Sequence, residues 1–285
     1  MASVISDDVD TIMFADDTNL FISGKDLSEM EADLNLVLNK VSKWLRYNLL
    51  SLNVKKTVCI VFSKRKLRPL QLFIANAPIE QVLETKFLGI ILSANLTWTS
   101  HITSVCTKLA KNIGIIAKVR YILPQCQVRL LYLTLVEPYL TYCCLIWASD
   151  VYSGMLARIH RLQKKYCRII TFAHFQAHSP PLFQTLKILT IYDIYTYQAK
   201  IYMYKITHNL LPQRFIGLSM NADIHSHNTR KSHQLHSEYC RTKSFKLTIR
   251  HNGPKLWNET PDEFKLLNLG AFKKRIKLTL LNGYG

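Results

Sequence analysis

Apolar and polar positions near the start of the chain alternate as they do in a β-hairpin. Two short β-prone runs, residues 11–14 and 18–23, flank the polar pair Asp16 and Asp17. Aspartate favours turns, and Gly24 can close the second strand. The pattern therefore predicts a hairpin that carries the two aspartates at its turn.

A helix and short strands are expected next. Asp26 can cap the first turn of a helix, and runs 57–62, 70–75 and 85–92 are short and apolar enough for strands. Between them, apolar residues recur at the spacing of one helical face: Met30, Leu34, Val37, Val41, Trp44 and Leu45.

The pattern changes at about residue 101, where long helical periodicities begin. They cover residues 101–120, 126–148, 154–173 and 188–209, and a basic helix is expected at 271–281. Strands followed by a run of helices indicate the α+β class. The fold expected is a β-hairpin, a helix and short antiparallel strands, followed by a mostly α-helical extension.

Residues 130–148 form the most apolar window of the chain. Glu137 and Pro138 interrupt it near its middle, and a charge at mid-bilayer is costly. We therefore expect a kinked core helix and no membrane partner. The seven cysteines, an odd number without a secretory signal, indicate reduced thiols in an intracellular protein.

The net charge of +18 is unevenly distributed. Residues 1–33 hold nine of the 19 acidic residues and one basic residue, Lys25. Residues 34–285 carry 36 basic against ten acidic residues. A basic body indicates a polyanionic partner, most simply nucleic acid, although such charge also serves solubility alone.

Two adjacent aspartates on a tight hairpin suit a metal site. Carboxylate oxygens are hard ligands for Mg²⁺, which takes one or two carboxylates and shares its other positions with water and phosphates. Polymerases use two such ions to activate the attacking 3′ oxygen and to stabilise the leaving group. Aspartates are also common in turns for structural reasons, so Asp16 and Asp17 alone do not decide between the two interpretations.

Their context does decide. Phe14-Ala15-Asp16-Asp17 resembles the aromatic-x-Asp-Asp signature of reverse transcriptases, in the form found in retrotransposons without long terminal repeats. Further segments resemble later motifs of that family in the same order: residues 44–57, 87–102, 226–230 and 253–258. The resemblance spans nearly the whole chain. It implies a partial palm over residues 1–95, a helical thumb or connection region over 96–215 and a basic C-terminal extension over 216–285.

The resemblance also implies roles for individual residues. Asp16 and Asp17 would be the catalytic, Mg²⁺-binding carboxylates. Lys55 or Lys56 would lie near the nucleotide or its phosphates, and the primer grip would be Phe87, Leu88 and Gly89. The lysines can equally be a solvated turn. The grip segment by itself indicates only a strand whose glycine permits close approach of another backbone.

One departure from the family concerns the remaining metal ligand. An active enzyme of this kind needs a further aspartate on an earlier palm strand, and fingers that hold the template. Only 15 residues precede Asp16, among them Asp7, Asp8 and Asp10. Asp10 would lie about 20 Å from Asp16 along an extended strand. We therefore expect a fragment that does not polymerise DNA alone.

The C-terminal part offers a second group of candidate ligands. Imidazole and thiolate bind zinc, but the spacing fits no known zinc pattern, so zinc is not expected. The group consists of His225, His227, His233, His236 and Cys240. The basic residues of this region suit phosphate contact better. The nucleic-acid-binding candidates are Arg230, Lys231, Lys273, Lys274 and Arg275.

Three functions remain open at this point. The first is a truncated reverse transcriptase that binds an RNA template and a DNA primer, and the second is a non-catalytic nucleic-acid-binding module. The third is an inert transposon relic. The family implies nuclear action, and an uncovered palm face would favour self-association.

Overall fold

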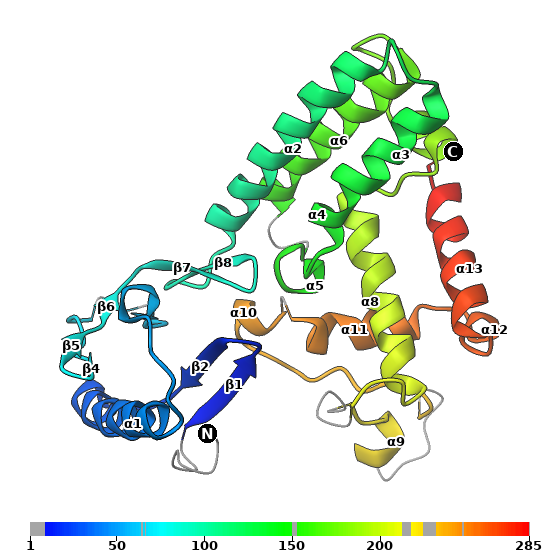
Figure 1. Ribbon diagram of the computed structural model, residues 1–285. Helices are drawn as coiled ribbons and strands as arrows, with labels where there is room; N and C mark the ends of the chain where they lie inside the picture. Colours follow the sequence, from blue (N-terminus) through cyan, green and yellow to red (C-terminus); the bar gives the residue numbers. More distant parts are fainter. Residues whose placement is uncertain are drawn as a thin grey trace. The chain divides into compact units, whose positions relative to one another are not determined.

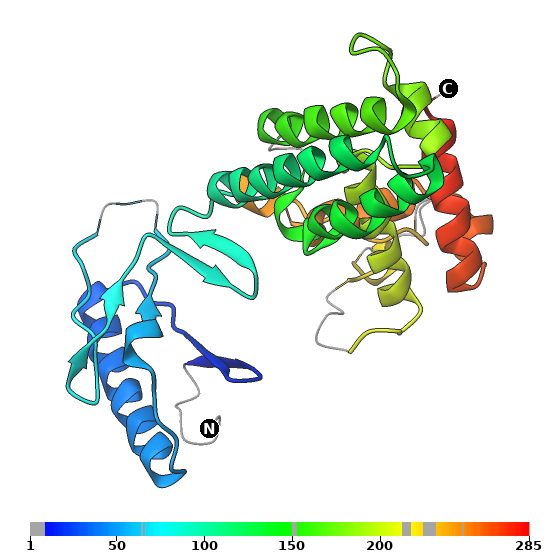
Figure 2. The ribbon, with the colours of Figure 1, turned by 45° about the horizontal axis from the view of Figure 1, so that its top comes forward.

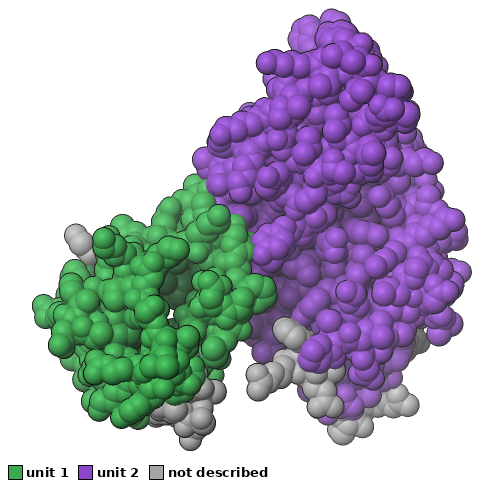
Figure 3. All heavy atoms as spheres, viewed as in Figure 1, with its two compact units in different colours: residues 1–100 green, residues 101–285 purple. Residues whose placement is uncertain are grey.

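The computed structural model describes residues 9–63, 65, 67–149, 153–212, 218–224, 232–246 and 248–284. The chain divides into two compact units, residues 1–100 and 101–285, which Figure 3 colours separately. The strands and one long helix lie in the first unit, and the second unit is helical in its described part (Figure 1), so the α+β class is confirmed. The predicted domain boundaries at 95/96 and 215/216 stay predictions.

Unit 1 combines one long helix with short strand pairs. Its elements are β1 (Asp10–Phe14), β2 (Asp17–Phe21), α1 (Leu27–Tyr47), the 3-10 turn η2 (Val54–Lys56), β3 (Val58–Cys59), β4 (Phe73–Ile74), β5 (Ala77–Pro78), β6 (Glu80–Gln81), β7 (Glu84–Phe87) and β8 (Ile90–Ser93). Within the described residues every sheet has two strands. The pairs β1–β2, β4–β5 and β7–β8 are antiparallel, whereas β3–β6 is parallel.

Helix α1 organises the core of unit 1. Asp26 caps it, because its side chain accepts hydrogen bonds from the backbone of Ser28 and Glu29 at 2.7 and 3.1 Å. The helix buries Val37, Leu38 and Val41 against the apolar residues around β4 and β5. The expected helix is therefore present, with its apolar stripe turned inward.

The side chain of Asn35 fastens α1 to the strand residues beside it. Its Nδ2 donates to the carbonyl of Gln71 at 2.9 Å, and its Oδ1 accepts from the backbone of Phe73 at 2.9 Å. One amide thus satisfies two backbone groups next to β4, much as a neighbouring strand would.

Unit 2 is built from helices in the described part of residues 101–285. They are α2 (Thr99–Val119), α3 (Gln125–Leu135), α4 (Glu137–Thr141), α5 (Cys144–Trp147), α6 (Ser153–Thr171), α7 (Pro180–Leu186), α8 (Ile191–Thr207), α9 (Asn221–Ile224), α10 (Lys243–Lys246), α11 (Ile249–Asn258), α12 (Asp262–Lys265) and α13 (Leu269–Asn282). None of the described helices is both long and apolar enough to cross a membrane.

Helices α2 and α6 lie side by side and run in the same direction (Figures 1 and 2). Near their starts, Arg158 donates to the hydroxyl of Thr103 at 3.3 Å. Near their ends, Arg120 donates to the carbonyl of Ile169 at 3.2 Å. Because the starts of the two helices contact each other and their ends do as well, the helices are parallel.

The single kinked helix predicted over residues 126–148 is wrong in part. The chain forms α3, α4 and α5 instead, with the first break at Val136 beside the expected Glu137–Pro138 site. The second break was not expected. It lies at Cys143, whose φ of 50° is left-handed and ends the helical path. Pro180 and Pro181 begin α7, in the first helical turn, where proline is tolerated.

A buried glutamine joins three parts of unit 2. The Nε2 of Gln163, on α6, donates to the hydroxyl of Tyr132 and to the carbonyl of Leu189, both at 3.0 Å. Its Oε1 accepts from the backbone of Ile191 at 2.8 Å, at the start of α8. Because the whole amide is paired, its burial is compatible with a stable core.

The C-terminal helices pack on α8. Tyr204 of α8, Trp257 of α11 and Phe272 of α13 meet in one apolar cluster. The Tyr284 hydroxyl also accepts a hydrogen bond from the backbone of Thr190 at 2.9 Å and bonds the carboxylate of Asp193. Residues 249–284 are therefore tied to α8 at both of its ends.

We expect unit 2 to lose stability as the pH falls from about 6.5 towards 4. Burial, reinforced by Lys164, lowers the pKa of His160 to about 4, whereas an unfolded histidine has a pKa of about 6.5. Between these values protons bind the unfolded chain preferentially, so stability is full above about 6.5 and falls below it. Melting temperatures measured from pH 7.5 to 4.5 should fall less steeply in His160→Gln, and parallel curves would contradict this assignment.

Candidate functional site

The two candidate catalytic aspartates lie at the end of the β1–β2 hairpin. Phe14 pairs with Asp17, so Ala15 and Asp16 form a two-residue turn. Ala15 has a φ of 52°, in the left-handed region that residues with a side chain seldom adopt. Such turns match the twist of the two strands, and this explains why the hairpin closes so tightly. The predicted position of the aspartates is confirmed.

Both carboxylates are open to solvent. Asp16 and Asp17 are exposed, and directly paired residues share a face, so Asp17 lies on the same face as Phe14 and Ile12. Phe14 and Ile12 are exposed as well. Two hard oxygen donors that are free of ion pairs among the described residues fit the one or two carboxylates that Mg²⁺ takes from a protein.

The described residues add no further ligand to this pair. Within them, no group of three or more His, Cys, Asp or Glu side chains could hold a metal ion. Asp10 begins β1 and pairs with Phe21, at the opposite end of the ribbon from the turn. Asp7 and Asp8 lie outside the described residues. The hairpin therefore presents two carboxylates, and the described residues place no third carboxylate beside them.

The structure places Lys55 and Lys56 in η2, close to the end of α1 in sequence. Both are exposed, and the turn is held by the hydroxyl of Thr57, which donates to the carbonyl of Asn53 at 3.2 Å. In the part of the chain that the structure describes, neither lysine forms an ion pair with Asp16 or Asp17. Their role at a nucleotide stays a prediction.

The predicted primer grip is a turn and not the middle of a strand. Residues 85–92 were expected to form one strand, but Phe87 pairs with Ile90 across a two-residue turn between β7 and β8. Leu88 and Gly89 occupy that turn with φ values of 44° and 86°. Positive φ at both central positions defines a type I′ turn, which favours glycine at the second position and not leucine at the first.

The sequence-predicted basic residues of the C-terminal part are only partly described. Arg230 and Lys231 lie outside the described residues. On α13, Lys274 and Arg275 are exposed, while Phe272 on the same helix is buried. The guanidinium of Arg275 lies over the ring of Phe264 at 5.2 Å. Lys273 is half-buried, so the helix presents Lys274 and Arg275 to solvent opposite its buried side, as an amphipathic helix does.

The candidate zinc ligands do not gather in the described part of the segment. His225 and His227 lie outside it. His236 contacts the side-chain oxygen of Asn221 at 3.1 Å, and the sulfur of Cys240 lies 3.9 Å from His251. The expectation that zinc is not bound stays a prediction, because two of the five candidates are not described.

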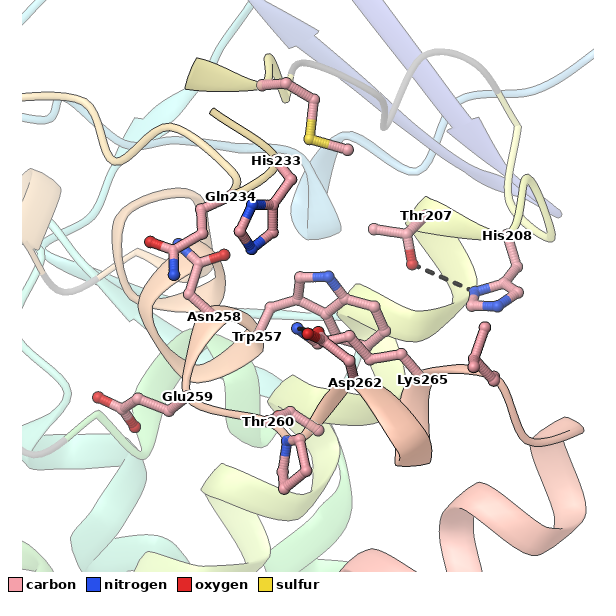
Figure 4. A pocket seen from close by; sticks show the side chains of 13 residues that line it. Thr207, His208, His233, Gln234, Trp257, Asn258, Glu259, Thr260, Asp262 and Lys265 are labelled. Carbon is pink, nitrogen blue, oxygen red and sulfur yellow. Dashed lines mark hydrogen bonds and ion pairs between the residues drawn. The ribbon is translucent and has the colours of Figure 1, made fainter. Parts of the chain in front are cut away.

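A pocket of about 480 Å³ opens in unit 2 beside Trp257 (Figure 4). Its main polar groups already serve the fold. Both ends of the Asn258 amide bond the backbone of Leu235, at 2.9 and 3.1 Å. Lys265 pairs with Asp262 at 2.8 Å and lies over the indole ring of Trp257. We therefore assign this pocket a structural origin.

A basic surface on α2 and α6 was missed by the sequence analysis. We call it the basic face, and it consists of the exposed residues Lys108, Lys111, Lys118, Arg158, Arg161 and Lys165. Cations three, seven and ten residues apart share one side of a helix. Between residues 99 and 192 the acidic residues are only Glu137 and Asp150. This local shortage of acidic residues is the sequence signal that could have indicated the basic face.

The two halves of the basic face belong to one surface. Arg158 of α6 reaches Thr103 of α2, as described above. Burial raises the pKa of the Cys106 thiol on α2, and the nearby cations Arg158 and Arg161 partly offset that rise. Both arginines therefore lie close to α2. The pair of helices presents cations from two parallel rows.

Comparison with curated proteins identifies relatives of one kind. In Drosophila melanogaster, a probable RNA-directed DNA polymerase from the transposon X-element is 27% identical over 158 residues, 54% of this chain. A probable RNA-directed DNA polymerase from transposon BS is 25% identical over 71% of the chain, and the one from the mobile element jockey is 25% identical over 72%. The chain is related to transposon reverse transcriptases. No family model and no solved structure matches it.

The reverse-transcriptase relatives agree with the family predicted from the motifs, that of retrotransposons without long terminal repeats. The chain spans 17% of the X-element polymerase and 23% of each of the other two reverse transcriptases. The chain therefore matches about a fifth of the length of these relatives, and their activity is not carried over to it by the match alone.

Proposed function

We propose that this chain is part of an Mg²⁺-dependent RNA-directed DNA polymerase, in which unit 2 binds the primed template and unit 1 supplies two carboxylates. The basic face carries the binding half of the proposal. Residues 1–100 contain 11 basic and 11 acidic residues, whereas residues 101–285 contain 26 basic and eight acidic ones. The whole excess charge thus lies in unit 2, where phosphates would be attracted.

The catalytic half rests on Asp16 and Asp17. Their exposure on a tight turn leaves both carboxylates able to face a primer terminus, and the strained φ of Ala15 is the kind of feature that persists at functional sites. Bound Mg²⁺ would help to activate the primer 3′ oxygen and to stabilise the leaving pyrophosphate. The task of the chain itself is to hold and orient the ions through these two side chains.

Extension should fail with the 285 residues alone. Because the described residues offer no third ligand beside the hairpin, the carboxylates that the structure describes there would form only part of a two-metal site. Binding needs no such completion. We therefore expect the chain to bind a primed RNA template without extending the primer.

The test combines binding with primer extension. The purified chain and Asp16→Ala are titrated onto a labelled, primed RNA template at several salt concentrations, and deoxynucleotides and Mg²⁺ are then added. We expect comparable binding by both proteins and a decline of log affinity with log salt by about 0.9 per phosphate contacted. Neither protein should extend the primer.

Two outcomes would contradict the proposal. Loss of binding in both proteins at low salt would remove the nucleic-acid role. Extension that Asp16→Ala abolishes would show that the third carboxylate comes from this chain or from a second copy of it.

The alternative is a binding module without a catalytic role, and the basic face favours it on its own. One experiment separates the polymerase part from the binding module. This chain is added to a full-length related polymerase that has been inactivated by changes in its own aspartate hairpin. Mg²⁺-dependent extension should return only if this chain can supply the catalytic carboxylates.

We further propose self-association through the exposed hairpin residues Ile12, Phe14 and Phe21, and action in the nucleus.

A further inference from the structure

The parallel helices α2 and α6 end at a cluster of exposed aromatic side chains. Tyr121 follows α2, and Phe172 and Phe175 lie in the loop that follows α6, which extends from the end of the helix pair in Figures 1 and 2. Their exposed fractions are 71%, 56% and 71%. We call these three residues the aromatic tip. Single exposed apolar side chains are common, but two exposed rings that touch each other, with a third three residues farther along the same loop, form a candidate binding surface.

Two of the rings are held together. Tyr121 and Phe172 pack edge to face with their centroids 5.7 Å apart. The guanidinium of Arg120 lies 4.6 Å from the first ring centre and 4.7 Å from the second, and Arg120 also bonds the carbonyl of Ile169. A ring pair fixed in this way loses little conformational freedom when a ligand stacks on it.

The backbone of Phe172 is strained. Its φ is 54°, in the left-handed region, at the position after a helix where glycine or asparagine is usual. A bulky residue there costs stability, and the ring, which is 56% exposed, offsets that cost only in part through its contacts with Tyr121 and Arg120. Packing therefore explains only part of why the position holds phenylalanine.

The surroundings of the tip are basic. Lys118 of the basic face lies in the last turn of α2, and Arg168, in the last turn of α6, adds a further cation near the tip. Arg168 donates to the carbonyl of Ala177 at 2.9 and 3.1 Å and so fixes the loop that carries Phe175. Exposed rings at the end of a cationic surface match the chemistry that binds an unpaired strand, whose bases stack while its phosphates are neutralised.

We propose that the aromatic tip binds unpaired bases of single-stranded RNA. The inference rests on the proposed function, since the strand that stacks on the tip would be the one whose phosphates contact the basic face. Stacking reads the π-face that every base has, so the tip would bind without strict sequence preference. The bases of an RNA duplex are already stacked on one another, so a duplex would contact only the basic face through its phosphates.

The test measures the affinity of the full chain for labelled rU15 and for a blunt RNA duplex of the same length. The variants are Phe172→Gly, which removes the ring and relaxes the backbone, and Phe175→Ala, separately and together. Tyr239→Ala is the control, because Tyr239 is an exposed tyrosine of unit 2 outside the tip. Phe172→Trp keeps a stacking surface.

The double variant should raise the Kd for rU15 about tenfold or more and leave the Kd for duplex within about twofold. The slope of log affinity against log salt should not change, because no charge is removed. Tyr239→Ala and Phe172→Trp should behave as the unmodified chain. Phe172→Gly should melt no earlier than the unmodified chain, so lost binding cannot be ascribed to unfolding.

Several results would overturn the inference. Unchanged binding of rU15 by the double variant, or equal loss on rU15 and duplex, would remove the stacking role. A more than tenfold preference for dT15 over rU15 would refute the assignment to RNA. Tip-dependent binding to phosphatidylserine vesicles with unchanged rU15 binding would assign the rings to a lipid surface. If the unmodified chain binds neither rU15 nor the duplex, the proposed function itself is wrong. If the chain binds RNA with a steep salt dependence and the tip variants bind equally well, only the role of the aromatic tip is wrong.

Discussion

Replacing Arg158, Arg161 and Lys165 together by glutamate should raise the Kd for a primed RNA template by about a hundredfold or more at 0.15 M salt. All three are exposed and share one side of α6. Each cation that contacts a phosphate releases counterions, so its loss lowers the salt slope by about 0.9, and a reversed charge adds repulsion. Fluorescence anisotropy at four salt concentrations gives both quantities.

A matched control separates the basic face from total charge. Lys40, Lys43 and Arg46 are exposed on α1 of unit 1, and their replacement by glutamate changes the net charge by the same amount. We expect this variant to bind within about threefold of the unmodified chain. Equal weakening by the two triple variants would mean that overall charge governs binding and that the basic face has no special role.

Phe272→Ala should lower the free energy of unfolding of unit 2 by about 3–5 kcal/mol. The Phe272 side chain is fully buried, and its ring centre lies 4.6 Å from that of Tyr204 and 6.0 Å from that of Trp257. Removal of the ring leaves a cavity between α8, α11 and α13. Amide hydrogen exchange should accelerate in the peptides that cover α8 and α13.

Leu266→Ala provides the comparison, because Leu266 lies near the same helices but is exposed. Surface substitutions of this kind change stability by less than about 0.5 kcal/mol. If the amides of α8 and α13 exchange as slowly in Phe272→Ala as in Leu266→Ala, the stability of the C-terminal helix does not depend on the packing of Phe272 against Tyr204 and Trp257. The two variants differ mainly in burial, so the contrast isolates packing.

Local features were predictable from the sequence, and tertiary ones were not. The hairpin and α1 follow from short-range signals: aspartates between two β-prone runs, then a capping Asp26 before a helical stripe. Leu88 and Cys143 misled the prediction because each adopts a positive φ that leucine and cysteine rarely show. Gly89 suits the turn after Leu88, but leucine and cysteine are not themselves residues that indicate a turn or a break.

The candidate site shows the same division. The positions of Asp16 and Asp17 were predicted because a motif fixes a turn. The basic face required the knowledge that α2 and α6 are neighbours and run parallel, which depends on contacts 49 and 55 residues apart in sequence. Periodic cations on each helix were visible beforehand, but their combination into one surface was not.

The uneven distribution of charge between the units has a consequence for the colloidal behaviour of the chain. Repulsion between the basic residues 101–285 of different copies opposes their association, whereas residues 1–100 carry equal numbers of basic and acidic residues and add no net repulsion. A polyanion bound to unit 2 cancels that repulsion. Saturation with nucleic acid would therefore leave the exposed hairpin residues without an electrostatic barrier against contact between copies.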